Sequence, residues 1–392
     1  MTKEIKKLVR SPKKNRQVFF GTYDLDMPRV RILKSAFGVQ GYEVCEIHYN
    51  LWKGIKDKSQ IKGILKKMLL CFKLFLNYPI LIIKFMTFPS LKTIVIPYMG
   101  VLDVLIIWPV ARLRGCRIIW DIFISTYDTV VNDRKLLSQK NIISRLIYFL
   151  EYIALRLVDR AVIDTQAHAQ YLEKVFHLED KSIKRVFVGV EKSFFCKGKT
   201  RDDTMLPFRK EHFNILFYGN YIPLHGIDVI LKAAKIFENE DIFSHVRWFL
   251  IGDGQEKLKM LEVSKQLDLS TVHFVDPVKY DELKHYIQGA SLCLGIFGTS
   301  SKAKSVIPNK VFQILSLGCP LVTMKTSAIA ELGDIDENLM GLSIPGSPKS
   351  LYLEVVRFIE KSSNGKEKVI SPVLFDEHFV SRQLSLELGD LI

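Results

Sequence analysis

Short apolar runs alternate with helix-forming segments along almost the whole chain, and this alternation restricts the fold more than any other feature. Strands that alternate with helices form parallel sheets covered on both faces. A length of 392 residues also suggests two domains rather than one core. We therefore predict an α/β protein in which two doubly wound, Rossmann-like domains face each other across a cleft. The predicted strands are 17–21, 43–47, 92–97, 117–122, 160–164, 185–189, 213–219, 246–252, 272–275, 292–297, 320–323 and 341–344.

The clearest helical periodicity lies in the second half of the chain, at 228–238, 255–267, 280–289 and 348–361. The polar stretch 197–204 is the best candidate for a linker. These patterns predict four parts: a basic tail at 1–16, a first domain at 17–198, a second domain at 199–375 and a C-terminal helix at 376–392.

The net charge of +14 is compatible with phosphate-bearing ligands, an anionic lipid surface or nucleic acid. Nucleic acid is disfavoured because no aromatic side chains are interleaved with the basic ones. The six cysteines form neither a CxxC pair nor a cluster with histidine, so we expect no bound metal and reduced thiols in the cytoplasm. The first apolar run, 18–20, is too short for a signal peptide, and no segment offers the roughly 20 apolar residues of a membrane span.

Two strand–turn–helix units, at 215–237 and 307–325, indicate the kind of ligand. In the first unit the strand ends at Gly219 and a helix begins near Gly226. Helix N-termini carry partial positive charge and free N–H groups, which favour phosphate. Neither GxGxxG nor GxxxxGK[ST] occurs in the chain, so a nucleotide has to be held by a different turn.

The ordered segments GNY (219–221), HGID (225–228), FLIGDG (249–254), PNKVFQ (308–313) and AIAEL (328–332) resemble retaining glycosyltransferases of family four, or glycosyl transferases group 1. The resemblance covers residues 213–346 well and extends more weakly to 158–172 and 187–195. It implies the GT-B fold, with a nucleotide diphosphate sugar bound by the second domain and the acceptor by the first. No cofactor is implied, because the nucleotide sugar is a substrate.

Several residues depart from the family pattern. Where relatives hold the donor diphosphate with an Arg and a Lys, this chain has Asn220 and His225. The family's pair of glutamates, spaced by seven residues, aligns with Ser305 and Gln313. We therefore expect the cationic role to pass to lysines of the next turn and helix, which are Lys302, Lys304 and Lys310.

Lys310 and Gln313 are three residues apart and so lie on one face of a helix. Lys310 also falls in the first helical turn, where the helix dipole disfavours a cation unless an anion binds there. The resemblance implies catalytic roles for Lys310, Lys302, Lys304, His225 and Asp121, and donor-binding roles for Gly219, Asn220, Tyr221, Gly226, Gly252, Asp253, Gly254, Ser305, Asn309, Gln313 and Glu331.

Structural alternatives remain open for several of these residues. Lys310 is alternatively a solvated lysine at a helix end, and His225 a histidine bonded to a backbone carbonyl. Asp253 is alternatively a turn former, Glu331 a surface or capping carboxylate, and Asp121 a buried structural residue.

The loop that follows the first strand is expected to line the acceptor side of the cleft, because ligands bind outside the carboxyl ends of parallel strands. It contains the acceptor-side candidates Gly21, Thr22, Tyr23 and Arg29. The alternative is a plain turn that carries a surface arginine.

The segment 61–88 is very apolar and carries a narrow basic stripe formed by Lys62, Lys66 and Lys73. Such a helix lies well in the plane of an anionic membrane surface, and relatives that act on lipid-linked acceptors often dock in this way. We expect Pro79 to end or kink this helix. The alternative is a mostly buried helix whose lysines extend to solvent.

Together these features predict a cytoplasmic enzyme, peripheral at the inner membrane face. It would transfer a sugar, with retention of the anomeric configuration, to a lipid-linked or membrane-glycan acceptor. We assign no residue as a nucleophile. A second hypothesis is a non-catalytic partner subunit, which the Ser305 and Gln313 departures favour. A third is a sugar-nucleotide epimerase, which does not account for the apolar segment 61–88.

Overall fold

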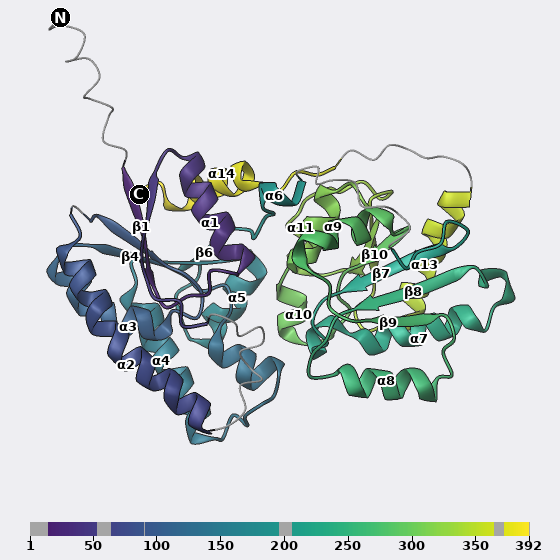
Figure 1. The fold of residues 1–392 in the computed structure, drawn as a ribbon, viewed down its shortest axis with the longest axis horizontal. Coiled ribbons are helices and arrows are strands. Elements are labelled where there is room, and N and C mark those ends of the chain that lie inside the picture. Colours follow the sequence, from purple (N-terminus) through teal and green to yellow (C-terminus); the bar gives the residue numbers. More distant parts are fainter. Residues whose placement is uncertain (1–14, 53–63, 90, 196–205, 364–371, 392) are drawn as a thin grey trace, which may run out of the picture.

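The computed structural model of the chain describes residues 15–52, 64–89, 91–195, 206–363 and 372–391. These residues form two domains that stand side by side, each built on a parallel six-stranded sheet (Figure 1). The strand orders are β2-β1-β3-β4-β5-β6 and β12-β11-β10-β7-β8-β9. This arrangement confirms the predicted pair of doubly wound α/β domains. The predicted linker 197–204 and nearly all of the basic tail lie outside the described residues.

The first domain begins at residue 16, and its helices cover both faces of its sheet (Figure 1). Helix α1 begins with Pro28 at its first position, where the missing N–H is not needed. Helix α5 is capped by the Thr165 hydroxyl, which accepts a hydrogen bond from the His168 amide. The elements are β1 (Arg16–Gly21), α1 (Pro28–Val39), β2 (Glu43–His48), α2 (Ile64–Thr87), β3 (Thr93–Ile96), α3 (Val101–Leu113), β4 (Arg117–Asp121), the π-helix η3 (Asp128–Asp133), α4 (Ile142–Leu157), β5 (Arg160–Ile163), α5 (Gln166–Val175), β6 (Ile183–Arg185) and α6 (Lys192–Phe195).

The second domain repeats the strand–helix alternation, and a last helix follows it. Its elements are β7 (Phe213–Tyr218), η5 (Pro223–His225), α7 (Ile227–Glu238), η6 (Asp241–Phe243), β8 (Val246–Ile251), α8 (Lys257–Gln266), β9 (Val272–Val275), α9 (Tyr280–Gly289), β10 (Leu292–Leu294), α10 (Ser301–Ser305), α11 (Asn309–Ser316), β11 (Leu321–Met324), α12 (Ser327–Ala330), β12 (Met340–Ser343), α13 (Pro348–Ser363) and α14 (Glu377–Leu388).

The predicted strand 185–189 is wrong in position. Strand β6 pairs with β5 over residues 183–185 only, and the apolar residues after it leave the sheet. Val186, Phe187 and Val188 are nevertheless almost fully buried, in a cluster that also contains Phe312 of the second domain. Their apolar character therefore reflects burial between the domains rather than strand pairing.

Helix α14 follows the second domain in sequence but packs on the first, beside α1 (Figure 1). The side-chain amide of Gln40 donates to the Ser381 carbonyl at 2.8 Å, and the Phe187 amide donates to Gln383 Oε1 at 2.7 Å. Val380, Leu384 and Leu388 of α14 are buried in the same apolar cluster as Phe37. The chain therefore passes from the first domain to the second and back again.

Helix α2 continues through Pro79 to Thr87, so Pro79 does not end the helix, and the other expected effect, a kink, stays a prediction. One side of α2 packs on the first domain through Tyr78, Leu81 and Phe85. Of the predicted basic stripe, Lys73 is exposed, whereas Lys62 and the Lys66 side chain lie outside the described part of the chain. Within the described ranges, no helix combines the length and the apolar character that a membrane span requires.

Candidate functional site

The turn after β7 brings the second-domain candidates Lys310 and His225 together. Gly219 follows this strand with a φ of +143°, and a Cβ there would lie 2.9 Å from His225 Cε1 and 3.2 Å from Lys310 Nζ. The absence of a side chain at Gly219 therefore lets the lysine and the histidine meet over the turn. Gly226 adopts the left-handed conformation (φ 63°) and begins α7, so this helix also presents its N-terminus here.

Lys310 is the most unusual group of the site. It lies in the first turn of α11 and is only 5% exposed. Its Nζ donates to the Gly295 carbonyl at 3.4 Å and sits 3.8 Å from the centre of the Phe217 ring. Among the described residues, no carboxylate forms an ion pair with it. Burial therefore lowers its pKa well below the ordinary value of 10.5.

His225 adopts the structural alternative, a histidine bonded to a backbone carbonyl. Its Nδ1 is bonded to the Asn220 carbonyl, which only accepts, so this nitrogen carries the proton. Burial and the neighbouring Lys310 lower the pKa of His225 well below 6.5. The ring is therefore neutral at pH 7, and its one N–H holds the Gly219–Asn220 turn in place.

A second glycine pair fixes the same turn from the side of β8. A Cβ on Gly252 (φ 145°) would meet the Gly219 carbonyl oxygen at 1.9 Å, and one on Gly254 would meet the Tyr221 amide nitrogen at 2.6 Å. The Tyr221 amide donates to the Asp253 carbonyl at 2.9 Å. These glycines thus allow two backbone segments to lie against each other.

Tyr221 and Asp253 differ from their expected donor-binding roles. The Tyr221 side chain is fully buried and donates to the Leu250 carbonyl at 3.1 Å, so it belongs to the core. The Asp253 carboxylate is exposed and accepts a hydrogen bond from the Gly254 amide at 2.8 Å, which is the contact of a turn former.

Gln313 lies on the face of α11 that carries Lys310, as the spacing predicts. Its Oε1 accepts from the Tyr218 hydroxyl at 3.0 Å, and its Nε2 donates to the Tyr280 hydroxyl at 3.2 Å. Both ends of the amide are therefore oriented by protein groups. Asn309 begins α11 and is half-buried beside this group.

The other two lysines do not join Lys310. The Lys302 Nζ reaches across to the first domain, where it donates to Thr129 Oγ1 at 2.6 Å and lies 3.4 Å from Asp128 Oδ2. Lys304 is exposed on the short helix α10. Ser305 is buried, and its carbonyl accepts from the Thr165 hydroxyl of the first domain. Their positions follow from interdomain packing, which no local pattern in the sequence reveals.

Glu331 also serves the domain interface. Its two carboxylate oxygens accept hydrogen bonds from the amides of Gln166 and Ala167, at 2.8 and 2.7 Å, in the first turn of α5. Arg185 lies 3.4 Å away. A carboxylate is stabilising at a helix N-terminus, so Glu331 is a cap supplied by the opposite domain. It is not part of the cluster that we call the Lys310 group, which consists of Lys310, His225, Gln313 and the turn 219–220.

The four acceptor-side candidates are tied into the first domain. Gly21 packs directly on the Asp103 carboxylate, which also accepts from the Thr22 amide at 3.1 Å and from the Tyr78 hydroxyl at 3.0 Å. Burial raises the pKa of Asp103 to about 6, although these hydrogen bonds oppose the rise. The Tyr23 hydroxyl donates to Glu46 at 2.8 Å.

Arg29 and Asp121 form a fully buried ion pair at 2.8 Å. The Arg29 guanidinium also donates to the carbonyls of Val186 and Phe187. A buried arginine was not expected, because only a cleft or surface position was considered. The Asp121 partner agrees with the structural alternative, and neither residue reaches the Lys310 group.

Sequence reasoning missed Phe217, Asp103 and Asp128. Phe217 stands in the mostly apolar strand β7, and nothing local shows that Lys310 will lie over its ring. Asp103 stands in an apolar helix, where an isolated carboxylate indicates a buried and hydrogen-bonded residue and could have been found from the sequence. The described residues contain no group of three or more His, Cys, Asp or Glu side chains placed to hold a metal ion.

The comparisons with known proteins agree with this architecture. The chain aligns with sucrose-phosphate synthase from Thermosynechococcus elongatus at a TM-score of 0.67 and 14% identity, covering 95% of this chain and 98% of the other. It aligns with Anabaena HepE in complex with UDP-glucose at a TM-score of 0.64 and 16% identity, covering 96% and 100%. The chain has the GT-B fold.

Within this GT-B chain, residues 212–361 match the family described as "Glycosyl transferases group 1". A further structure, the apo form of the lipopolysaccharide outer core galactosyltransferase WaaB, aligns at a TM-score of 0.54 and 12% identity, covering 95% of this chain and 94% of the other. The comparison with curated protein sequences found no match. The Lys310 group lies inside the matched family segment.

Proposed function

We propose that the protein is a glycosyltransferase that uses a nucleotide diphosphate sugar and transfers the sugar with retention of configuration. The observation that carries this proposal is the buried Lys310 amine, which has no carboxylate counter-ion among the described residues and lies beside the start of α7. A lysine buried in this way is stabilised when an anion binds next to it. The family match over 212–361 and the UDP-glucose complex of HepE support a diphosphate as that anion.

In this mechanism the acceptor oxygen forms a bond to the anomeric carbon while the bond from that carbon to the diphosphate oxygen breaks. The acceptor proton passes to a phosphate oxygen of the leaving group. Lys310 and the N-terminus of α7 stabilise the charge that develops on the diphosphate. His225 acts as a positioning residue, because its N–H holds the Asn220 carbonyl.

The direct test is a screen of nucleotide sugars by mass spectrometry, with thermal-shift measurements on UDP, GDP, ADP, CDP and dTDP in parallel. We expect one nucleoside diphosphate to raise the melting temperature of the protein. We also expect the corresponding nucleotide sugar to be converted, with release of the same nucleoside diphosphate. Nucleotide binding without any turnover would instead favour the partner-subunit hypothesis. If no nucleotide binds, both the donor-site assignment and the enzyme proposal fail.

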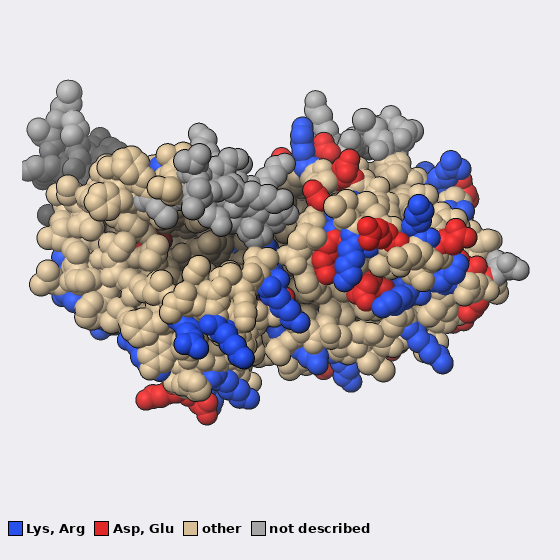
Figure 2. All heavy atoms as spheres, turned by 90° about the horizontal axis from the view of Figure 1, so that it is seen from below, with Lys and Arg blue, Asp and Glu red and all other residues tan. Residues whose placement is uncertain are grey.

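We further propose that the acceptor is lipid-linked or a membrane glycan, and that the protein works at the cytoplasmic face of an anionic membrane. The support is the outer side of α2, where eight apolar side chains are 49–77% exposed: Met68, Leu69, Phe72, Phe75, Leu76, Ile80, Ile83 and Met86. On the face drawn in Figure 2, the first domain presents a broad area without charged side chains, with Lys and Arg near its edge and a small group of Asp and Glu at its lower end, whereas the second domain mixes both signs throughout. Apolar side chains flanked by cations suit an anionic lipid surface.

Replacing Phe72 and Phe75 together by Ser should weaken binding to phosphatidylglycerol vesicles by at least about tenfold, because each buried Phe contributes about 2 kcal/mol. Replacing Lys62, Lys66 and Lys73 by Glu as well should weaken vesicle binding further, and a higher salt concentration should also weaken it. Vesicle co-sedimentation measures both. The matched control replaces Leu258 and Leu353, which are exposed on the second domain. Equal vesicle binding by all variants would refute the membrane proposal.

A further inference from the structure

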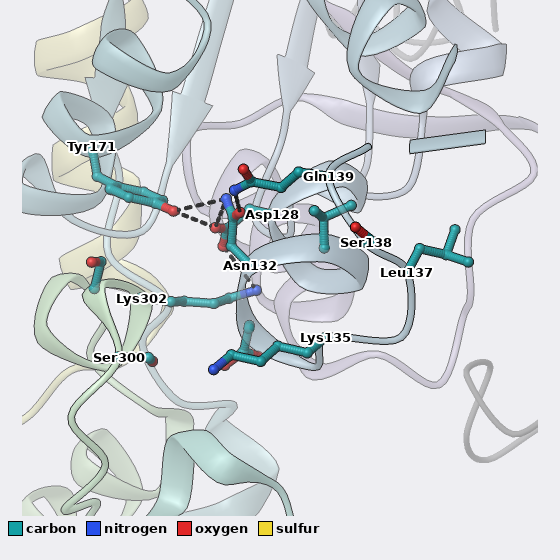
Figure 3. Close-up of a pocket in the computed structure, with 12 residues that line it drawn as sticks. Asp128, Asn132, Lys135, Leu137, Ser138, Gln139, Tyr171, Ser300 and Lys302 are labelled. Carbon is teal, nitrogen blue, oxygen red and sulfur yellow. Dashed lines mark hydrogen bonds and ion pairs between the residues drawn. The ribbon is translucent and has the colours of Figure 1, made fainter. Parts of the chain in front are cut away.

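A pocket of about 580 Å³ lies between the two domains and is not used by the Lys310 group. Its volume falls within the roughly 300–1,000 Å³ of small-molecule sites. The first domain contributes η3, the loop that follows it and Tyr171 of α5, while the second domain contributes residues 300–302 at the start of α10 (Figure 3). Only three residues separate α10 from α11, which carries Lys310.

The wall of the pocket that η3 forms is held by a hydrogen-bond network. The Tyr171 hydroxyl donates to Asp128 Oδ1 at 2.5 Å, and Asn132 Nδ2 donates to the same oxygen at 3.2 Å. Gln139 Nε2 in turn donates to Asn132 Oδ1 at 3.3 Å (Figure 3). A π-helix is rare and occurs often at functional sites. Here it places Asp128, Asn132 and Asp133 along one cavity.

Asp133 is the side chain that nothing in the fold explains. It lines the pocket, is 5% exposed, and its Oδ1 accepts no hydrogen bond from any described residue. Burial raises its pKa, Asp128 adds to the rise, and Lys302 and Arg134 oppose it. A buried carboxylate oxygen without a partner is unfavourable. A ligand with hydrogen-bond donors would remove that penalty.

The charges of the pocket exclude the simplest ionic ligands. Lys302 is already paired with Asp128 and Thr129, and the exposed Lys135 only balances the second carboxylate of the lining. The pocket therefore has no excess of positive charge that would favour a phosphate. A metal ion is disfavoured because no cluster of three suitable ligands is present among the described residues. The lining that remains is rich in amide and hydroxyl groups, among them Ser138, Gln139, Ser300 and Ser301. These groups match a neutral ligand with several hydroxyls.

We propose that this interdomain pocket binds a saccharide and that Asp133 Oδ1 accepts a hydrogen bond from one of its hydroxyl groups. Building on the proposed function, the pocket is the binding site of the acceptor glycan. It replaces the loop 21–29 in that role, because Thr22, Tyr23 and Arg29 are already engaged inside the first domain. Asp133 is thus a specificity-determining residue for the acceptor.

The test is saturation-transfer-difference NMR of the full chain with the methyl α- and β-glycosides of glucose, galactose, mannose and N-acetylglucosamine. We expect saturation transfer to at least one glycoside with the wild type and at least a fivefold loss in Asp133→Ala. Asp133→Asn should retain part of the signal, because its amide oxygen still accepts. The matched control is Asp180→Ala, an exposed carboxylate of the same domain that should change nothing.

A second variant guards against misfolding of Asp133→Ala. Ser301→Phe fills the pocket from an exposed position and should also abolish the signal. Nucleotide binding, measured separately by thermal shift, should persist in both variants, so loss of saccharide binding is distinguishable from failure of the donor-site proposal. The absence of saturation transfer to every glycoside, or equal transfer in wild type and variants, overturns the saccharide assignment whatever the nucleotides do.

Discussion

Replacing Lys310 by Met should raise the melting temperature of the ligand-free protein and at the same time weaken nucleoside diphosphate binding about 100-fold. The first effect follows because the buried Lys310 has a lowered pKa, whereas the unfolded chain has the ordinary value of 10.5. At a pH below 10.5, unfolding is therefore accompanied by protonation of Lys310. This proton uptake favours the unfolded state and lowers the stability of the folded protein. Removing the amine eliminates this penalty, for a gain of about 2 °C or more. The second effect is the loss of a buried charge partner for the diphosphate.

The pH dependence of nucleotide binding tests the same role of Lys310. In the wild type, an anion raises the lowered pKa of Lys310 back toward its usual value, so nucleotide binding takes up a proton. Affinity should therefore fall as the pH rises from neutral into the alkaline range, and this slope should vanish in Lys310→Met. Calorimetry in buffers of different ionisation enthalpy measures the proton uptake. Lys304→Met is the control, because Lys304 is exposed on the neighbouring helix. Unchanged nucleotide affinity in Lys310→Met would remove Lys310 from the donor site.

Replacing Gly252 by Ala should destabilise the protein by about 3 kcal/mol or more and abolish nucleotide binding, because strain and overpacking act together. The new Cβ would meet the Gly219 carbonyl at 1.9 Å, and backbone cannot move aside as a flexible side chain would. The φ of +145° adds strain of its own. Chemical denaturation and a thermal-shift assay with the nucleotide that binds the wild type measure the two effects.

Gly41 provides the matched control for conformational strain. Its φ is +89°, but a Cβ there would meet nothing within 4 Å. Gly41→Ala should therefore be destabilised by backbone strain alone, by about 1 kcal/mol, and should keep nucleotide binding. If Gly252→Ala behaves like Gly41→Ala, the close approach of the two backbone turns is not what shapes the site.

The fold was accessible from the sequence because burial in a parallel sheet leaves a local record. Residues 213–218 and 246–251 are apolar except for Asn214 and Arg247, and both form inner strands of the second sheet. The displaced strand at 185–189 shows the limit of this logic. Val186 and Phe187 are apolar because they are buried between domains, and periodicity does not distinguish that environment from a sheet.

The site was only partly accessible. Gly219, Gly226 and Lys310 lie at one turn, as predicted, because a strand–turn–helix unit fixes the position of its own turn. Their role in donor binding stays a prediction. The partners of Lys302, Ser305 and Glu331 lie about 140 to 175 residues away in the first domain. Such pairings depend on how two domains dock, so sequence spacing gave the wrong neighbours. Arg29 was predicted to lie on the acceptor side of the cleft because its counter-ion, Asp121, is 92 residues away in sequence and the spacing does not reveal the pair.

The return of the chain to the first domain sets the order in which the protein can be completed during synthesis. Helix α14 covers α1, yet α14 is synthesised after the whole second domain. Until it emerges, Phe37 and its neighbours lack the cover that Val380, Leu384 and Leu388 later provide. The domain that is translated first is therefore the last to complete its hydrophobic core, and the second domain is an insertion within it.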